Sequence, residues 1–250
     1  MPLPPGGRVL VGLTASEFVL LSVTVGAGAL LQVSIGFGLG MLAAPVFSLV
    51  DPSLTPTVVL LLATGVTATV LVRERGRADL RGCGWALAGR LPGVLAGTLL
   101  VVALPARYLA LLIAGVVLTG VTVSLAGFVP RQRRSAVVLA GLASGLMGTA
   151  TSIGGPPMAM VWQRLSGPEL RATMSAFFLV GSLMSLAALT AAGAVGPHAL
   201  RGTAVLAPAA VVGVLLARPL TRRLNVRRTR TAATALAVAG AVVLVLRQFL

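Results

Sequence analysis

The chain has 250 residues, of which 57% are hydrophobic and only 10% are charged, and its mean hydropathy is +1.01. This composition excludes a soluble domain and predicts an all-α polytopic membrane protein. The net charge of +15 comes from arginines that lie between apolar runs, which is typical of cytoplasmic loops and argues against nucleic-acid binding. A single cysteine, Cys83, excludes an intrachain disulfide and any multi-cysteine metal site.

The first apolar run, residues 18–50, contains no charged residue. It is longer than the about 20 residues that one membrane span needs and shorter than the roughly 40 that two spans with a turn need. Its middle reads SIGFGLG, residues 34–40, where glycines allow the chain to turn. The run therefore predicts a hairpin of two shorter helices that returns to the side it entered from. Three ordinary spans are expected to follow, within residues 54–72, 83–106 and 108–130.

The second half of the chain repeats this order. Residues 135–163 are again free of charge and are broken by TSIGGPP, and apolar runs follow at residues 172–200, 202–217 and 231–246. SIGFG begins at Ser34 and SIGGP at Ser152, 118 residues later, while DLRG and ALRG lie 120 residues apart. We therefore expect one membrane domain made of two homologous halves, residues 10–128 and 133–250.

The arginines indicate how the halves are oriented. If each opening run is a hairpin, each half has three spans, the halves are inverted, and fifteen arginines lie on one side against four on the other. If each opening run crosses once, the halves are parallel with four spans each, and the division is ten against nine. The positive-inside rule favours the inverted repeat, with the parallel arrangement of four plus four spans as the alternative.

The two breaks are the predicted binding site. Non-helical backbone at membrane depth is tolerated where protein or a water-filled cavity satisfies it, and matching breaks in two halves mark the substrate site of many transporters. We expect the breaks to meet near the midplane and to bind one small anion through backbone N–H groups, hydroxyls and the start of the returning helix. The predicted substrate-binding residues are Gln32, Ser34, Gly36, Gly38, Thr151, Ser152, Gly154, Gly155 and Pro156. No catalytic residue, metal or cofactor is expected.

Two interpretations of single features stay open. The glycines could serve only close helix packing, as Gly89, Gly93 and Gly97 do in a spacing of four. Arg90 is a candidate for function because a charge at membrane depth is costly. It lies only seven residues after Cys83, however, so we expect its side chain to reach the headgroup region instead.

These motifs also carry a resemblance. The stretches GFGLGMLAAPVFSLV, DLRG, GLASGLMGTATSIGGPPMAM and LRATMSAFF resemble the sulfite exporter TauE/SafE family of bacterial permeases over nearly the whole chain. The chain departs from the family where a Thr-Ser pair is usual after the first break, since it has only Thr57 and Thr64 there.

The resemblance implies a function. It implies a permease of the bacterial inner membrane that moves a small anion such as sulfite, a sulfonate or a carboxylate by alternating access. A membrane-embedded lipid phosphatase and a passive anion channel are the alternatives. The expected partners are the small anionic substrate and the lipid bilayer, with a homodimer left open and no nucleic acid.

Overall fold

A computed structural model describes residues 8–10, 12–74, 76–125, 133–165, 167–221 and isolated positions between 235 and 246. Helices make up almost all of this part, apart from a short pair of antiparallel strands, β1 (Arg8–Leu10) and β2 (Leu13–Thr14). The helices are α1 (Ala15–Ile35), α2 (Leu39–Val50), the 3₁₀ turn η1 (Pro52–Leu54), α3 (Thr57–Arg73), α4 (Leu80–Ala103), α5 (Ala106–Leu125), α6 (Arg134–Thr151), α7 (Gly155–Val161), α8 (Gly167–Ala191) and α9 (Pro197–Thr221). The last predicted span, residues 231–246, lies mostly outside the described residues.

Four of the described helices are long and apolar enough to cross a membrane: α1, α4, α8 and the part of α9 from Pro197 to Ala217. Their outward faces carry large apolar side chains, including Leu91, Leu95 and Leu99 on α4. An apolar surface of this size is stable only against lipid or another protein. The prediction of an all-α, multi-pass membrane protein is therefore confirmed.

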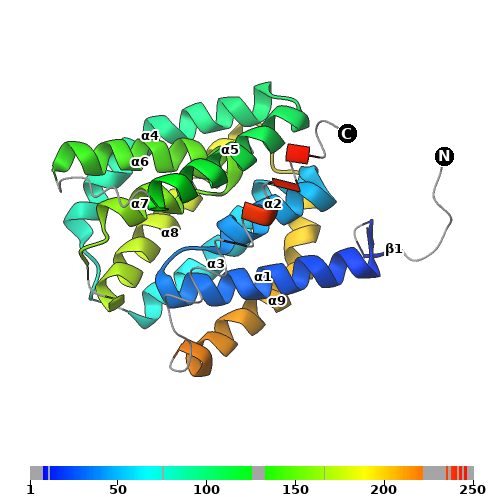
Figure 1. The fold of residues 1–250 in the computed structure, drawn as a ribbon, viewed down its shortest axis with the longest axis horizontal. Coiled ribbons are helices and arrows are strands. Elements are labelled where there is room, and N and C mark those ends of the chain that lie inside the picture. The colour runs from blue at the N-terminus through cyan, green and yellow to red at the C-terminus, as the bar shows by residue number, and fades with distance from the viewer. Residues whose placement is uncertain are drawn as a thin grey trace.

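The first apolar run folds as a hairpin, with α2 returning along α1 (Figure 1). Gly36 ends α1 with φ 88°, and Gly38 precedes α2 with φ 134°, conformations that residues with a Cβ rarely adopt. The backbone N–H of Leu39 donates to Oε1 of Gln32 at 3.2 Å, which closes the turn. The two arms are unequal, because α1 has 21 residues and α2 has 12. The prediction of two short arms is therefore wrong for the first arm.

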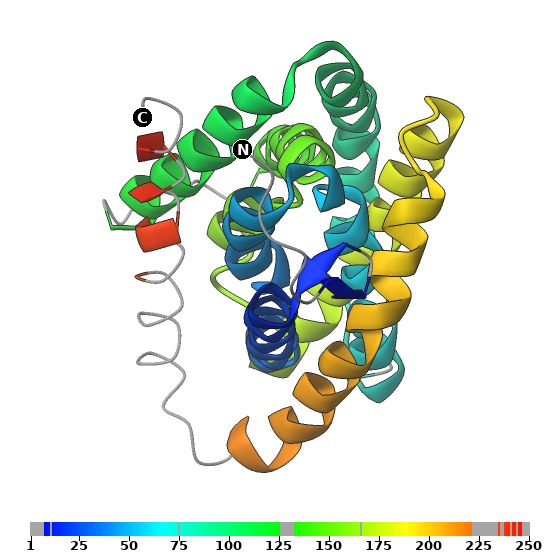
Figure 2. The same ribbon diagram turned by 90° about the vertical axis from the view of Figure 1, so that its right-hand side faces the viewer.

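The second run breaks at TSIGGPP. Ser152 ends α6 in the left-handed region with φ 62°, and α7 begins at Gly155 with two prolines in its first turn, where their missing N–H groups leave no hydrogen bond unmade. Gly154 lies against Gly148 of α6, so α7 also turns back. This returning arm has only seven residues. Seen from the end of the molecule, the two hairpins occupy the middle and the other helices surround them (Figure 2).

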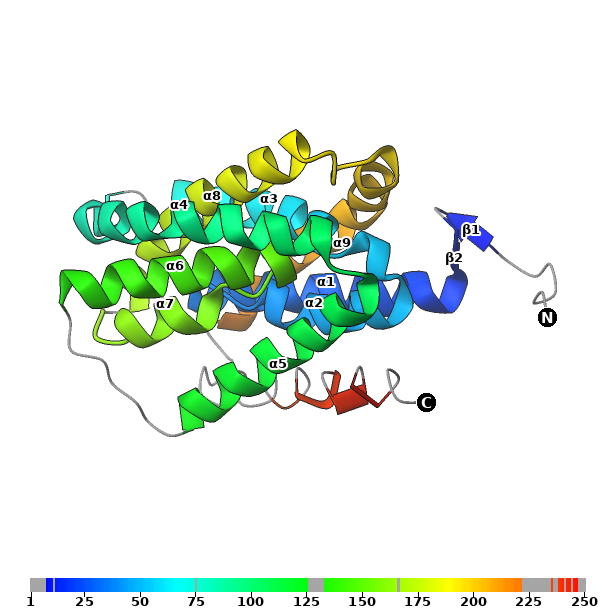
Figure 3. The ribbon, with the colours of Figure 1, turned by 90° about the horizontal axis from the view of Figure 1, so that it is seen from above.

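The helices around the hairpins pack through small residues. Side by side in Figure 3, α4 and α6 approach so closely that a Cβ on Gly89 or Gly93 would overlap a backbone carbonyl of α6. Likewise, α1 packs on α9, where a Cβ on Gly213 would overlap the carbonyl of Gly26. The third pair, α3 and α8, is joined by a hydrogen bond of 2.8 Å from Thr64 to Ser182. Close approach through glycine is how apolar helices gain van der Waals contact in lipid.

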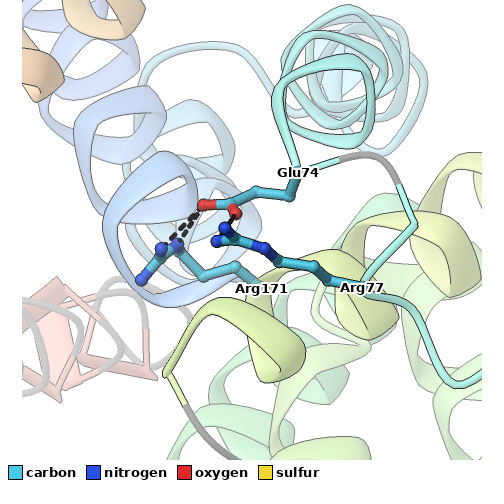
Figure 4. Close-up of polar contacts among 3 residues, drawn as sticks. All are labelled: Glu74, Arg77 and Arg171. Atoms are coloured by element: carbon cyan, nitrogen blue, oxygen red, sulfur yellow. Dashed lines mark hydrogen bonds and ion pairs between the residues drawn. The ribbon is translucent and has the colours of Figure 1, made fainter.

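Ion pairs connect loop residues to neighbouring helices at two opposite ends of the molecule. At one end, Glu74 after α3 binds Arg171 of α8 at 2.7 Å and Arg77 at 3.1 Å (Figure 4). At the other end, Asp51 after α2 lies 3.2 Å from His198 of α9. Burial alone would raise the pKa of the Asp51 carboxyl. Hydrogen bonds with Ser53 and His198 lower this pKa by a larger amount, so it lies below its ordinary value. We call the end that holds Arg77 and Arg171 the arginine-rich end. The contact between Asp51 and His198 lies at the opposite end.

Candidate functional site

The two broken helices are in contact. A Cβ on Gly40, in the first turn of α2, would overlap the carbonyl oxygen of Ser152. A Cβ on Gly155, the first residue of α7, would lie 2.7 Å from the ring of Phe37. Real Cβ atoms almost never come that close to another atom, so the hairpins touch only because both positions are glycine.

These contacts join residues of the two predicted breaks, and each break also reaches beyond the other. A Cβ on Gly36 would lie 3.2 Å from Cα of Arg171, so the first break reaches the first turns of α8 beside the arginine-rich end. The hydroxyl of Ser152 donates to the carbonyl of Pro56, just before α3, at 3.0 Å. The hairpins therefore overlap: each tip extends past the other and contacts the start of a helix from the other half of the chain.

A cavity lies where the hairpins overlap. The volume open to the centres of water molecules is about 40 Å³, and its polar side chains are those of Gln32, Arg90, Ser152 and Ser182. The complete lining is Gln32, Phe37, Gly38, Gly40, Met41, Leu60, Ala63, Arg90, Gly148, Ser152, Ile153, Gly154, Gly155, Phe178 and Ser182. Residues from both hairpins and from three other helices thus converge on one space.

Five of the predicted site residues line this cavity: Gln32, Gly38, Ser152, Gly154 and Gly155. Four predicted residues, Ser34, Gly36, Thr151 and Pro156, are not among its lining residues. Ser34 and Thr151 donate their hydroxyl hydrogens to the helix carbonyls of Leu30 and Met147, each at 2.7 Å. These two serve the ends of their own helices, which sequence spacing alone could not distinguish from facing a ligand.

The hydroxyls at the breaks are therefore not the free donors that the sequence interpretation assumed. Ser152, the one predicted hydroxyl in the lining, already donates to Pro56. The amide oxygen of Gln32 accepts a hydrogen bond from the backbone N–H of Leu39. This N–H, the first of α2, is therefore already used within the protein. Neither group is therefore a free hydroxyl or helix-start N–H for a ligand in the cavity.

The cavity is also lined by Arg90, which the sequence interpretation placed in the headgroup region. The prediction is wrong, because Arg90 is 1% exposed within the protein itself and lines the cavity. Its Nη1 donates to Oγ of Ser144 at 3.0 Å, and Ser144 in turn donates to the carbonyl of Gly154 at 2.7 Å. Its guanidinium also lies over the ring of Phe177, 4.9 Å from the centroid.

The sequence carried a signal for this position. Gly89, Gly93 and Gly97 mark a face of α4 that packs on α6, and Arg90 directly follows the first of them. A side chain beside such a packed face is covered by the neighbouring helix, so it cannot extend to the headgroups. Recognising that needs the position of α6, which only the fold provides.

Cys83 is buried, and its thiol lies 3.4 Å from the carbonyl of Thr173, so it packs between α4 and α8. Among the described residues there is no group of three or more His, Cys, Asp or Glu that could hold a metal ion. The described lining of the cavity also contains no carboxylate and no histidine, the side chains that acid–base chemistry uses most.

This multi-pass membrane protein contains two hairpins of broken helices with a cavity between them. Such an arrangement is typical of secondary transporters. The comparison of sequences agrees: the model of the sulfite exporter TauE/SafE family matches residues 20–244, and the chain belongs to that family. A probable sulfite/organosulfonate exporter TauE of Cupriavidus necator is 28% identical over 209 residues, which cover 79% of this chain and 82% of the relative. No solved structure matches the chain.

Proposed function

We propose that this protein is a carrier that moves a small organic or inorganic oxyanion, a sulfite, sulfonate or carboxylate, across the bacterial inner membrane. The observation that carries the proposal is the cavity between the two overlapping breaks, which holds a buried guanidinium. The described relative is a probable sulfite/organosulfonate exporter, which favours sulfur oxyanions as the first substrates to test.

The two alternatives have less support. A lipid phosphatase needs an acid–base pair beside a phosphate-binding cluster, and the cavity offers an arginine with only neutral polar neighbours among the residues that line it. A channel needs a continuous polar path, whereas the described lining of the cavity has four polar side chains among apolar residues and glycines.

Flux into sealed vesicles tests the function. Purified protein in proteoliposomes should take up labelled sulfite or ethanesulfonate with a rate that saturates, and uptake should accelerate when the vesicles are preloaded with the same unlabelled anion. Only a carrier shows this counterflow. Non-saturating flux without counterflow would indicate a channel, and phosphate release from a lipid phosphate would indicate an enzyme.

We further infer that the two halves, residues 10–128 and 133–250, are an inverted repeat. The proposed correspondence relates α1 to α6, α3 to α8 and α4 to α9. If the halves are equivalent, the contact between α4 and α6 must have a counterpart between α9 and α1, and α3 must contact α8. All three contacts are present. The ion pair of Glu74 with Arg171 adds support, because the parallel arrangement would put these two residues on opposite sides of the membrane.

Cysteine labelling tests this orientation. We expect that Arg77→Cys, at the arginine-rich end, is protected from a membrane-impermeant maleimide in intact cells, and that Arg201→Cys, at the opposite end, reacts. Both native side chains are exposed, and Cys83→Ala provides a background free of other thiols. Labelling of Arg77→Cys before cell lysis would contradict the orientation, and labelling of both variants would contradict their placement on opposite sides.

A further inference from the structure

We propose that Arg90 is the cationic group that binds the transported anion, and that the site therefore selects monoanions with a planar or tetrahedral oxyanion head. This rests on the proposed function, since it names the binding group and the charge class of that same cavity.

The charge of Arg90 is buried without a counter-ion. The ion pairs of the described residues are Glu74 with Arg77 and Arg171, and Asp51 with His198, and none of them includes Arg90. Its partners are the hydroxyl of Ser144 and the ring of Phe177, both neutral. A buried charge is costly unless an opposite charge and hydrogen bonds compensate for it. A permanently charged guanidinium in this place is thus stabilised by an anion that enters the cavity.

The guanidinium still has a donor to offer. Its Nε has no hydrogen-bond partner among the described residues and is covered by Gly181, whereas its Nη2 lies beside Gly148, which lines the cavity. Unmade donors of this kind are rare in proteins and call for a ligand or another explanation. Arg90 is also the largest fully buried side chain that lines the cavity.

Glycines on two other helices make room for this side chain. A Cβ on Gly181 of α8 would overlap Nε of Arg90, and a Cβ on Gly148 of α6 would lie 3.2 Å from its Nη2. The guanidinium is thereby fixed at the meeting point of α4, α6 and α8. A group held in this way can bind an anion without a further loss of side-chain entropy.

The charge balance sets the class of substrate. The described lining contains one arginine and no second cation, so one negative charge neutralises it. A dianion would leave an uncompensated charge in a cavity that is otherwise lined by groups such as Phe37, Met41 and Phe178. A planar guanidinium matches two oxygens of one carboxylate or sulfonate head, and the apolar wall suits a short hydrocarbon body.

Equilibrium binding to the purified protein tests the proposal, alongside counterflow in proteoliposomes. The probes are ethanesulfonate and acetate as monoanions and ethane-1,2-disulfonate as a dianion of fixed charge, together with whichever anion gives the strongest counterflow. We expect Arg90→Met to weaken monoanion binding by about 100-fold or more, which is within the range for removing one partner of a desolvated charge pair. Arg90→Lys should recover part of the affinity, because it restores the charge without the planar fork.

Ser144→Ala is the matched control for a purely structural role. It breaks the link from Arg90 to the carbonyl of Gly154 but keeps the charge, so its affinity should fall by less than about tenfold. If Arg90→Met does not fold, Gly181→Ala decides, because it displaces the guanidinium without removing it. We expect Gly181→Ala to lose affinity, while Gly84→Ala on α4, whose Cβ would meet nothing within 4 Å, keeps it.

The outcomes separate this inference from the proposed function. Unchanged affinity in folded Arg90→Met would show that Arg90 does not bind the anion. If Arg90→Met does not fold, unchanged affinity in Gly181→Ala would show the same. Neither result would contradict the proposal that the protein is a carrier. Disulfonate binding as tight as ethanesulfonate binding would overturn the selection for monoanions. A wild-type protein that shows no counterflow with any anion would instead overturn the proposed function.

Discussion

Gly40→Val is expected to abolish transport. The Cβ of any other residue at this position would overlap the carbonyl oxygen of Ser152, which is backbone and cannot rotate away. The valine must therefore push the two hairpins apart, and the cavity that lies between them loses its shape. We expect counterflow to fall to background in proteoliposomes that contain the same amount of inserted protein.

Gly65→Val on α3 is the matched control, because a Cβ there would meet nothing within 4 Å. It should keep wild-type flux. A Cβ on Gly155 would instead meet the Phe37 ring, a side chain that can shift, so we expect a substitution at Gly155 to cost less than one at Gly40. Full activity of a folded Gly40→Val protein would show that contact between the hairpins is not needed for transport.

Gly93→Val is expected to give a large loss of stability. A Cβ on Gly93 would overlap the carbonyl oxygen of Leu142, so α4 and α6 must separate along their closest contact. Overpacking usually costs about 1–3 kcal/mol, and a clash with backbone lies at the upper end of that range or beyond. The melting temperature of the detergent-solubilised protein should fall by several degrees.

Gly84→Val, on the same helix but with open space around it, controls for the change in helix propensity from glycine to valine. Its melting temperature should stay close to that of the wild type. Equal melting temperatures for both variants and the wild type would mean that the α4–α6 contact contributes little to the stability of the fold.

Much of the fold could be predicted because bilayer physics restricts it. Charge-free runs of the wrong length for one or two spans predicted the hairpins, and the glycines of SIGFGLG and SIGGPP placed the breaks within a residue or two. The unequal arms could not be predicted, since the length of α1 is set by Thr14 and Glu17, which cap its start, and by Gly36, which ends it.

The cavity was predicted less completely. Glycines at the breaks are local features, so Gly38, Gly154 and Gly155 could be found from the sequence. Arg90 and Ser182 come from helices far along the chain, and only the packing of α4 and α8 on the hairpins brings them in. Residues such as Ser34 carry a hydroxyl near the break, but α1 uses it for its own carbonyl.

The location of a bound anion tests the central claim most directly. Crystals of the protein grown with 2-bromoethanesulfonate would show the ligand by the anomalous signal of its bromine. We predict one site in the cavity, with sulfonate oxygens at hydrogen-bond distance from the guanidinium of Arg90. An empty cavity, with the ligand instead in the surface hollow beside Arg81, Arg133 and Arg134, would contradict the account.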